Sequence, residues 1–160
     1  MAGADSCERV KALARELADS LGNDDNDGLT KFYLTWKTLN LRKQHASTFQ
    51  QGDYLPLAVM GAKANHLVAF ARREGSSAAI VTVPRMCARL LVNGATSPAQ
   101  SGLWEDTRIE LPPELSKSSY RNALTAELLR PEKAGESGFL RASSLLETFP
   151  VALLTVESGK

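Results

Sequence analysis

The chain has 160 residues, with 19 lysines and arginines against 18 aspartates and glutamates, so its formal net charge is +1. A near-neutral chain creates no field that draws in nucleic acid, and we expect no nucleic-acid partner. No apolar run approaches the roughly 18 residues of a membrane span, so no membrane association is expected either. The length allows one domain but excludes a complete (β/α)₈ barrel, which needs about 250 residues.

Two amphipathic helices are expected at the N-terminus, over residues 5–21 and 28–46. The first has one apolar stripe, whereas the second has two. Phe32, Trp36 and Leu39 form one stripe of the second helix, and Leu34 and Leu41 form the other. A helix that is apolar on two sides normally packs on two sides. The second helix therefore indicates a missing partner, unless the first helix covers one of its stripes.

The acidic segment between these helices resembles the start of a calcium-binding loop, because residues 23–28 read Asn-Asp-Asp-Asn-Asp-Gly. Such a loop needs a carboxylate at its twelfth position, which is Leu34 here, so the pattern excludes calcium. His45 and His66 are too isolated for a metal site, and we expect no metal and no cofactor. Cys7 and Cys87 are expected to be free buried thiols in a reducing cytoplasm.

The apolar period changes to that of strands after residue 52. Strands are expected over residues 54–60, 66–73, 78–83, 107–111, 120–125 and 151–156, with a helical turn at 145–149. Pro56 places the first strand at a sheet edge, the almost wholly apolar 78–83 strand should be central, and residues 112–113 and 135–138 read as breakers. The predicted fold class is α+β: two N-terminal helices followed by an antiparallel β-sandwich-like domain, with boundaries at 1–50 and 51–160.

No catalytic constellation is visible in the sequence. Glu105 and Asp106 are adjacent, and neighbours on a strand point to opposite faces, so they do not converge on one bond. Trp104, Tyr54 and Tyr120 are the candidates for stacking on sugar rings. Aromatic residues of small β domains more often belong to the core, and both interpretations stay open.

An ordered series of short segments nevertheless resembles a known family. It comprises DGLTKFYLTWK at 27–37, LRK at 41–43, Phe49, GDYLPL at 52–57, VAFAR at 68–72, VTVPR at 81–85, LWEDT at 103–107, YRN at 120–122 with Thr125, and FPVALL at 149–154. In this order the segments are similar to maltooligosyltrehalose synthase, a family of the α-amylase superfamily. The similarity spans roughly residues 27–156.

The resemblance implies a parent isomerase that converts the reducing-end α-1,4 bond of a maltooligosaccharide into an α,α-1,1 bond. This intramolecular transglucosylation takes place on a (β/α)₈ barrel whose catalytic groups lie upstream of the matched region, so no catalytic role passes to this chain. Helix 28–46 resembles the last barrel helix.

The resemblance therefore implies a cytoplasmic, non-catalytic C-terminal domain whose partner is the missing catalytic barrel. Two alternatives stay open. One is a stand-alone module that binds maltooligosaccharide, and the other is a homodimer formed through helix 28–46.

Overall fold

The computed structural model describes residues 2–20, 27–91, 95–100 and 102–157. Two long helices, α1 (Ala2–Asp19) and α2 (Asp27–Gln44), precede the strands, as predicted. The shorter helices are α3 (Ala46–Gln50), η1 (Ala64–His66), α4 (Cys87–Leu90), α5 (Pro113–Ser116) and α6 (Ala142–Leu146). None of the described helices is both long enough and apolar enough to cross a membrane.

The strands form two antiparallel sheets, which confirms the predicted α+β class. The larger sheet has the order β1-β3-β4-β10-β6-β7, and the smaller has the order β2-β5-β9-β8. Their bounds are β1 (Asp53–Leu57), β2 (Val59–Met60), β3 (Leu67–Glu74), β4 (Ser77–Pro84), β5 (Arg108–Leu111), β6 (Tyr120–Asn122), β7 (Leu128–Leu129), β8 (Glu132–Ala134), β9 (Ser137–Arg141) and β10 (Ala152–Val156).

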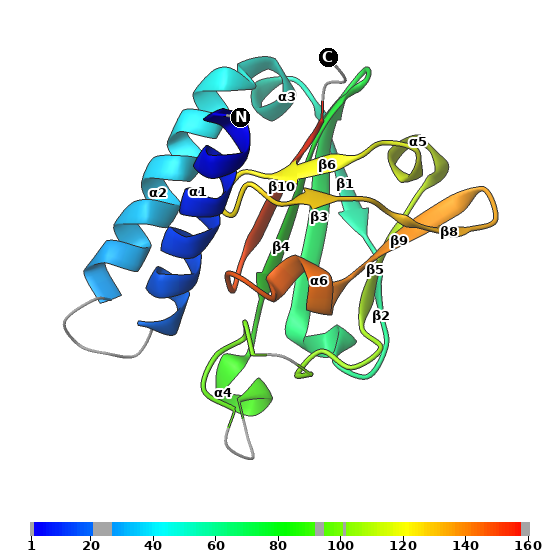
Figure 1. The fold of residues 1–160 in the computed structure, drawn as a ribbon. Coiled ribbons are helices and arrows are strands. Elements are labelled where there is room, and N and C mark those ends of the chain that lie inside the picture. The colour runs from blue at the N-terminus through cyan, green and yellow to red at the C-terminus, as the bar shows by residue number, and fades with distance from the viewer. Residues whose placement is uncertain (1, 21–26, 92–94, 101, 158–160) are drawn as a thin grey trace.

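The main core lies between the two sheets (Figure 1). Ile80 of β4 and Leu154 of β10 meet Ile109 and Leu140 from the smaller sheet in this cluster. The opposite face of the larger sheet carries a second cluster, which joins it to the long helices. That cluster contains Ala14, Ala18, Tyr33, Leu41, Leu124, Phe149 and Leu153. Strands β4 and β10 are thus covered on both faces, which explains their almost continuous apolar sequence.

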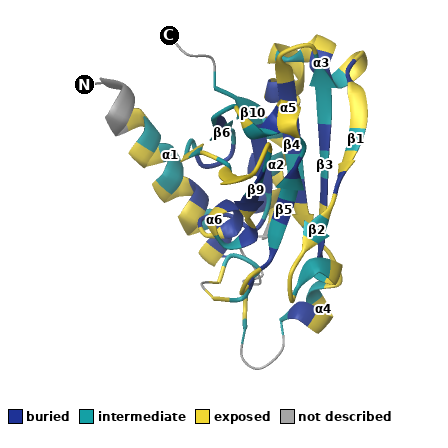
Figure 2. Cartoon of the chain, turned by 90° about the vertical axis from the view of Figure 1, so that its right-hand side faces the viewer, coloured by how far each residue is buried: buried dark blue, intermediate teal, exposed yellow. Residues whose placement is uncertain are grey.

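Strand β1 lies at one edge of the larger sheet and pairs only with β3 within the described residues. Pro56 has no N–H to donate to a ladder, so the prediction of an edge strand is confirmed. Figure 2 shows the exposed residues of β1 at this margin. The predicted strand over 54–60 is, however, two strands. The strand is interrupted at Ala58, and β2, which follows it, pairs with β5 in the smaller sheet.

Other predicted boundaries also differ. Helix 28–46 ends at Gln44, and α3 follows it after His45. The strand predicted over 120–125 ends at Asn122, where the chain turns. The breaker predicted at 135–138 is wrong in part, because β8 and β9 form a hairpin across it. Gly135 makes the turn with a φ of 66°, whereas Gly138 lies inside β9.

A substitution at Gly52 tests how closely the backbone is packed where α3 leads into β1. An added Cβ would press on the Thr48 carbonyl oxygen and lie 2.9 Å from that of Arg73. We expect Gly52→Ala to lower the free energy of unfolding by about 2 kcal/mol in a urea titration, since backbone must move to admit the methyl group.

Gly28→Ala is the matched control, because a Cβ there meets nothing within 4 Å. Alanine favours a helix over glycine, so this variant should be as stable as the parent or up to about 1 kcal/mol more stable. Equal stability of the two variants would contradict the close packing at Gly52.

Candidate functional site

Two of the three predicted stacking residues are buried in the core between the sheets. Trp104 is 1% exposed and Tyr120 is 0% exposed. The Trp104 indole donates to the Pro98 carbonyl oxygen at 2.8 Å, and the Tyr120 hydroxyl donates to that of Leu115 at 2.6 Å. Burial raises the pKa of Tyr120. Both aromatic rings are therefore part of the fold and present no free face to a sugar.

Tyr54 is the one of the three that reaches the surface, with 55% of its area exposed. It lies on the outer face of the larger sheet, opposite Arg72 in register. Its ring packs against that of Phe70, with centroids 5.1 Å apart and planes tilted by 31°. The structure therefore does not bring the three predicted residues together.

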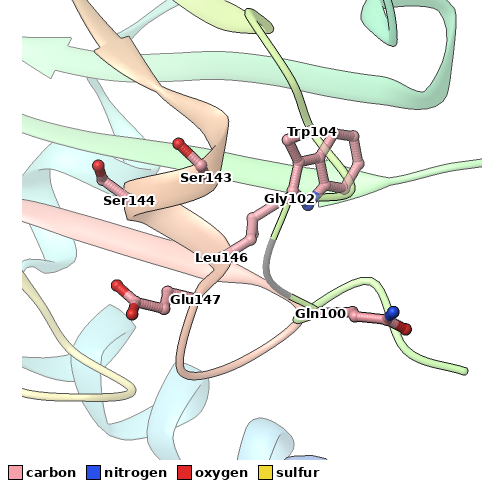
Figure 3. A pocket seen from close by; sticks show the side chains of 7 residues that line it. All are labelled: Gln100, Gly102, Trp104, Ser143, Ser144, Leu146 and Glu147. Atoms are coloured by element: carbon pink, nitrogen blue, oxygen red, sulfur yellow. The ribbon is translucent and has the colours of Figure 1, made fainter. Parts of the chain in front are cut away.

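A small cavity opens beside Trp104 (Figure 3). Its volume is about 200 Å³, and its polar groups come from Gln100, Ser143, Ser144 and Glu147. In Figure 3 the Glu147 carboxylate and the Gln100 amide point to opposite sides. Its described lining residues include no histidine or lysine, and Glu147 is the one titratable group among them.

The adjacent carboxylates also have local roles. Glu105 pairs with Lys63 at 3.1 Å, and Asp106 accepts a hydrogen bond from the Ala62 N–H at 2.8 Å. Both therefore fasten the loop around residues 61–63. Within the described part of the chain, no three His, Cys, Asp or Glu side chains gather as metal ligands. Residues 23–26 of the calcium-like segment lie outside that part.

The two thiols are unpaired, as predicted, but neither is fully buried. Cys7 contacts the Ala126 carbonyl oxygen at 3.2 Å, and Cys87 begins the short helix α4. Both cysteines are therefore partly exposed residues outside the two hydrophobic core clusters.

A groove opens beside Tyr54, between α2, α3 and the outer face of the larger sheet, with a volume of about 480 Å³. We call it the aromatic groove. Its lining residues are Leu34, Thr38, Arg42, Phe49, Tyr54, Phe70, Arg72, Val81, Val151 and Leu153. The sequence did not predict it, because these residues come from separate helices and strands. The one pattern that could have indicated the groove is the pair Tyr54 and Arg72, which lie opposite each other on the neighbouring strands β1 and β3.

A second exposed feature is an apolar stripe along α2. Its four side chains are between 52% and 68% exposed, and we call them the outer stripe. They are Leu29, Phe32, Trp36 and Leu39. Three of them form the stripe predicted from the sequence, and Leu29 extends it by one turn. The described part of the chain leaves this stripe uncovered.

The opposite side of α2 holds the helix on the sheet. Tyr33 is buried, its hydroxyl donates to the Leu124 carbonyl oxygen at 2.5 Å, and burial raises its pKa to about 12. Its ring contacts that of Phe149 at a centroid distance of 5.9 Å. Leu41, from the second predicted stripe, is also buried in this cluster. Leu41 follows Phe32 by about two and a half helical turns, so the two side chains project from opposite sides of α2. Because Leu41 is packed on the sheet side, the outer stripe around Phe32 faces away from it.

Glu127 fixes α1 to the same region. It pairs with Lys11 at 2.8 Å and accepts hydrogen bonds from Thr125 at 2.7 Å and Thr148 at 3.0 Å. Burial alone would raise the pKa of Glu127, but these hydrogen bonds and the Lys11 charge together lower it below its ordinary value. The hydrogen bond with Glu127 likewise raises the pKa of Lys11.

The chain was compared with known proteins. No protein-family model and no curated protein sequence matches it. Solved structures do match it, among them maltooligosyltrehalose synthase from Arthrobacter ramosus, with a TM-score of 0.60, and a point mutant of that enzyme, with 0.61. Each is 28% identical, and each match covers 91% of this chain. This chain resembles one part of a maltooligosyltrehalose synthase.

The resemblance predicted from the sequence is therefore confirmed by structure. The match covers only 17% of the synthase chain, so this chain spans about one sixth of that protein's length. The match therefore describes the fold of this chain, and it does not assign the activity of the whole synthase to this chain.

Glu127→Gln tests the attachment of α1. Because the folded-state pKa of Glu127 is lowered, its charge stabilises the fold above the ordinary pKa, and that stability is lost as the pH falls through the folded value. We expect the variant to lose about 2 kcal/mol at pH 7 and to show a weaker acid dependence. Chemical denaturation between pH 3 and about 8 measures both effects.

Glu132→Gln is the control, since Glu132 also pairs with a basic side chain, that of Arg141 at 2.7 Å, but on the exposed surface. An exposed ion pair contributes little, so this variant should unfold like the parent at pH 7. If both variants behaved alike, the Glu127 contacts would not hold α1 in place.

Proposed function

We propose that this chain is a non-catalytic, C-terminal domain of a maltooligosyltrehalose synthase, and that it supports the catalytic barrel by packing against it through the outer stripe. The observation that carries the proposal is that stripe: four large apolar side chains aligned on a helix whose other side is already packed. Fully burying one such side chain contributes about 1.5–3 kcal/mol. An exposed set of them marks an interaction surface.

The small share of the synthase that the match covers also supports the catalytic barrel as the partner. The chain matches 91% of its own length but 17% of the synthase, so most of the synthase has no counterpart in it. In this proposal the parent enzyme converts the terminal α-1,4 bond of a maltooligosaccharide into an α,α-1,1 bond on that larger portion. This chain contributes α2 and the two sheets, and works in the cytoplasm.

Carbohydrate binding by this chain alone has less support. Tyr54 is the one predicted stacking residue that is exposed, and the groove beside it is mostly apolar. A homodimer through α2 would bury the same outer stripe, so it competes directly with the proposed partner. The proposal expects the isolated chain to leave maltopentaose unchanged, and any trehalose-type product would contradict it.

Removing apolar surface from the outer stripe tests the partner. The double variant Phe32→Ser and Trp36→Ser is titrated into the Arthrobacter ramosus synthase from which the matched segment has been removed, and calorimetry measures the affinity. We expect the unmodified chain to bind, and the double variant to bind at least about tenfold more weakly, since buried aromatic residues dominate interface energies. Equal affinities would contradict the proposal.

Met60→Ser on β2 is the matched control, because Met60 is 50% exposed and its strand belongs to the smaller sheet, on the other side of the core from α2. It should bind like the unmodified chain.

A chimaera that carries this chain in place of the matched segment gives a second measurement that does not need the trimmed synthase to fold alone. There the same double variant should lower the melting temperature. Light scattering that showed a stable dimer, broken by the double variant, would favour the homodimer instead.

A further inference from the structure

The aromatic groove has the properties of a small-molecule site. It is bounded by α2 on one side, α3 at its end and the outer face of the larger sheet as its floor. Its volume of about 480 Å³ falls within the roughly 300–1,000 Å³ typical of ligand pockets. It uses a different side of α2 from the outer stripe, because Leu34, Thr38 and Arg42 line it and none of the stripe residues does.

The floor and one wall of the groove are apolar. Val81 and Leu153 form part of the floor, on strands that pair in register, and the tilted rings of Tyr54 and Phe70 form the wall. Tyr54 is more than half exposed, so a ligand that covered it would remove a large apolar ring from water. The groove therefore favours a ligand with a hydrocarbon portion.

The remaining side chains give the groove a basic end. Arg42 and Arg72 both line it, and its described lining residues include no carboxylate. The Arg72 Nη2 donates to the Phe49 carbonyl oxygen at 3.1 Å, but its buried Nε has no hydrogen-bond partner among the described residues. Because this Nε is buried, a ligand in the groove would meet the guanidinium groups of Arg72 and Arg42 at their accessible nitrogens, which bind a carboxylate by charge-assisted hydrogen bonds.

A sugar fits this lining poorly. A hexose presents hydroxyl groups around its whole edge, and each one buried without a partner costs free energy. Thr38 and the Tyr54 hydroxyl are the uncharged polar side-chain groups in the described lining, and no amide or carboxylate is available to accept from a sugar. The groove therefore selects against a polyhydroxylated ring and for an apolar chain that ends in one negative charge.

We propose that the aromatic groove binds a small amphipathic carboxylate, with its hydrocarbon chain between the Tyr54–Phe70 wall and the sheet floor and its carboxylate at Arg72 and Arg42. The proposal does not rest on the proposed function, because the outer stripe takes no part in it. It can fail while the synthase proposal stands, and the reverse is also true.

Titration with decanoate tests the site on the intact chain, by calorimetry and by amide chemical shifts. We expect saturable binding with shifts confined to the groove. Decanol, which has the same chain without the charge, should bind at least about tenfold more weakly, because it cannot form the charge-assisted bond. Hexanoate keeps the carboxylate but buries four fewer methylene groups, so it should also bind at least tenfold more weakly.

Two variants locate the charge. Arg72→Gln and Arg42→Gln should each weaken decanoate about tenfold and leave decanol unchanged. Arg42 is exposed, so its variant tests the site even if Arg72→Gln disturbs the fold. Arg89→Gln, on α4 at the opposite end of the molecule from α3 in Figure 1, is the control and should bind decanoate like the parent.

Three outcomes would overturn the proposal. The first is no binding of decanoate, and the second is tighter binding of maltopentaose than of decanoate in the groove. The third is a groove that takes no decanoate but becomes protected when the trimmed synthase binds, which would make it part of that protein interface.

Discussion

The hydrogen bond from the Tyr33 hydroxyl to the Leu124 carbonyl oxygen is the contact on which the exposed surfaces depend. A buried tyrosine needs an acceptor, and a tight turn supplies it. The Asn122 side chain holds that turn by accepting from the Leu124 N–H at 3.0 Å, and Ala126 closes it with a φ of 61°. Because Glu127 follows in the same segment and binds Lys11, one turn positions both long helices.

Both candidate surfaces follow from this attachment. With Tyr33 and Leu41 held inward, Phe32 projects from the side of α2 opposite Leu41, and Phe32 and Trp36 both stay more than half exposed. The same placement of α2 leaves the β1 side of the outer sheet face open. The aromatic groove lies there, between the helix and the rings of Tyr54 and Phe70. The interface and the ligand site we propose are thus two consequences of how one helix is fixed.

The sequence predicted features whose signal is local. Helical spacing identified α1 and α2, Pro56 identified an edge strand, and the uninterrupted apolar run of β4 identified a central one. It did not predict which aromatic rings are buried, because Trp104, Tyr54 and Tyr120 occur in similar sequence surroundings. Their burial depends on how the chain is shared between two sheets, and the break at Ala58 that divides β1 from β2 has no strong local signal. The groove needs tertiary contacts from α2, α3 and the sheet, so no short pattern encodes it.

The central claim is that a larger portion of a synthase covers the outer stripe, and Trp36 reports on this directly. The chain has two tryptophans, Trp36 at 52% exposure and Trp104 at 1%. With 5-fluorotryptophan in this chain alone, fluorine NMR in H₂O and D₂O separates a solvated indole from a buried one. On addition of the trimmed synthase, we predict that the Trp36 signal loses its solvent isotope shift while the Trp104 signal stays unchanged. A Trp36 signal that kept its full isotope shift at saturation would contradict the account.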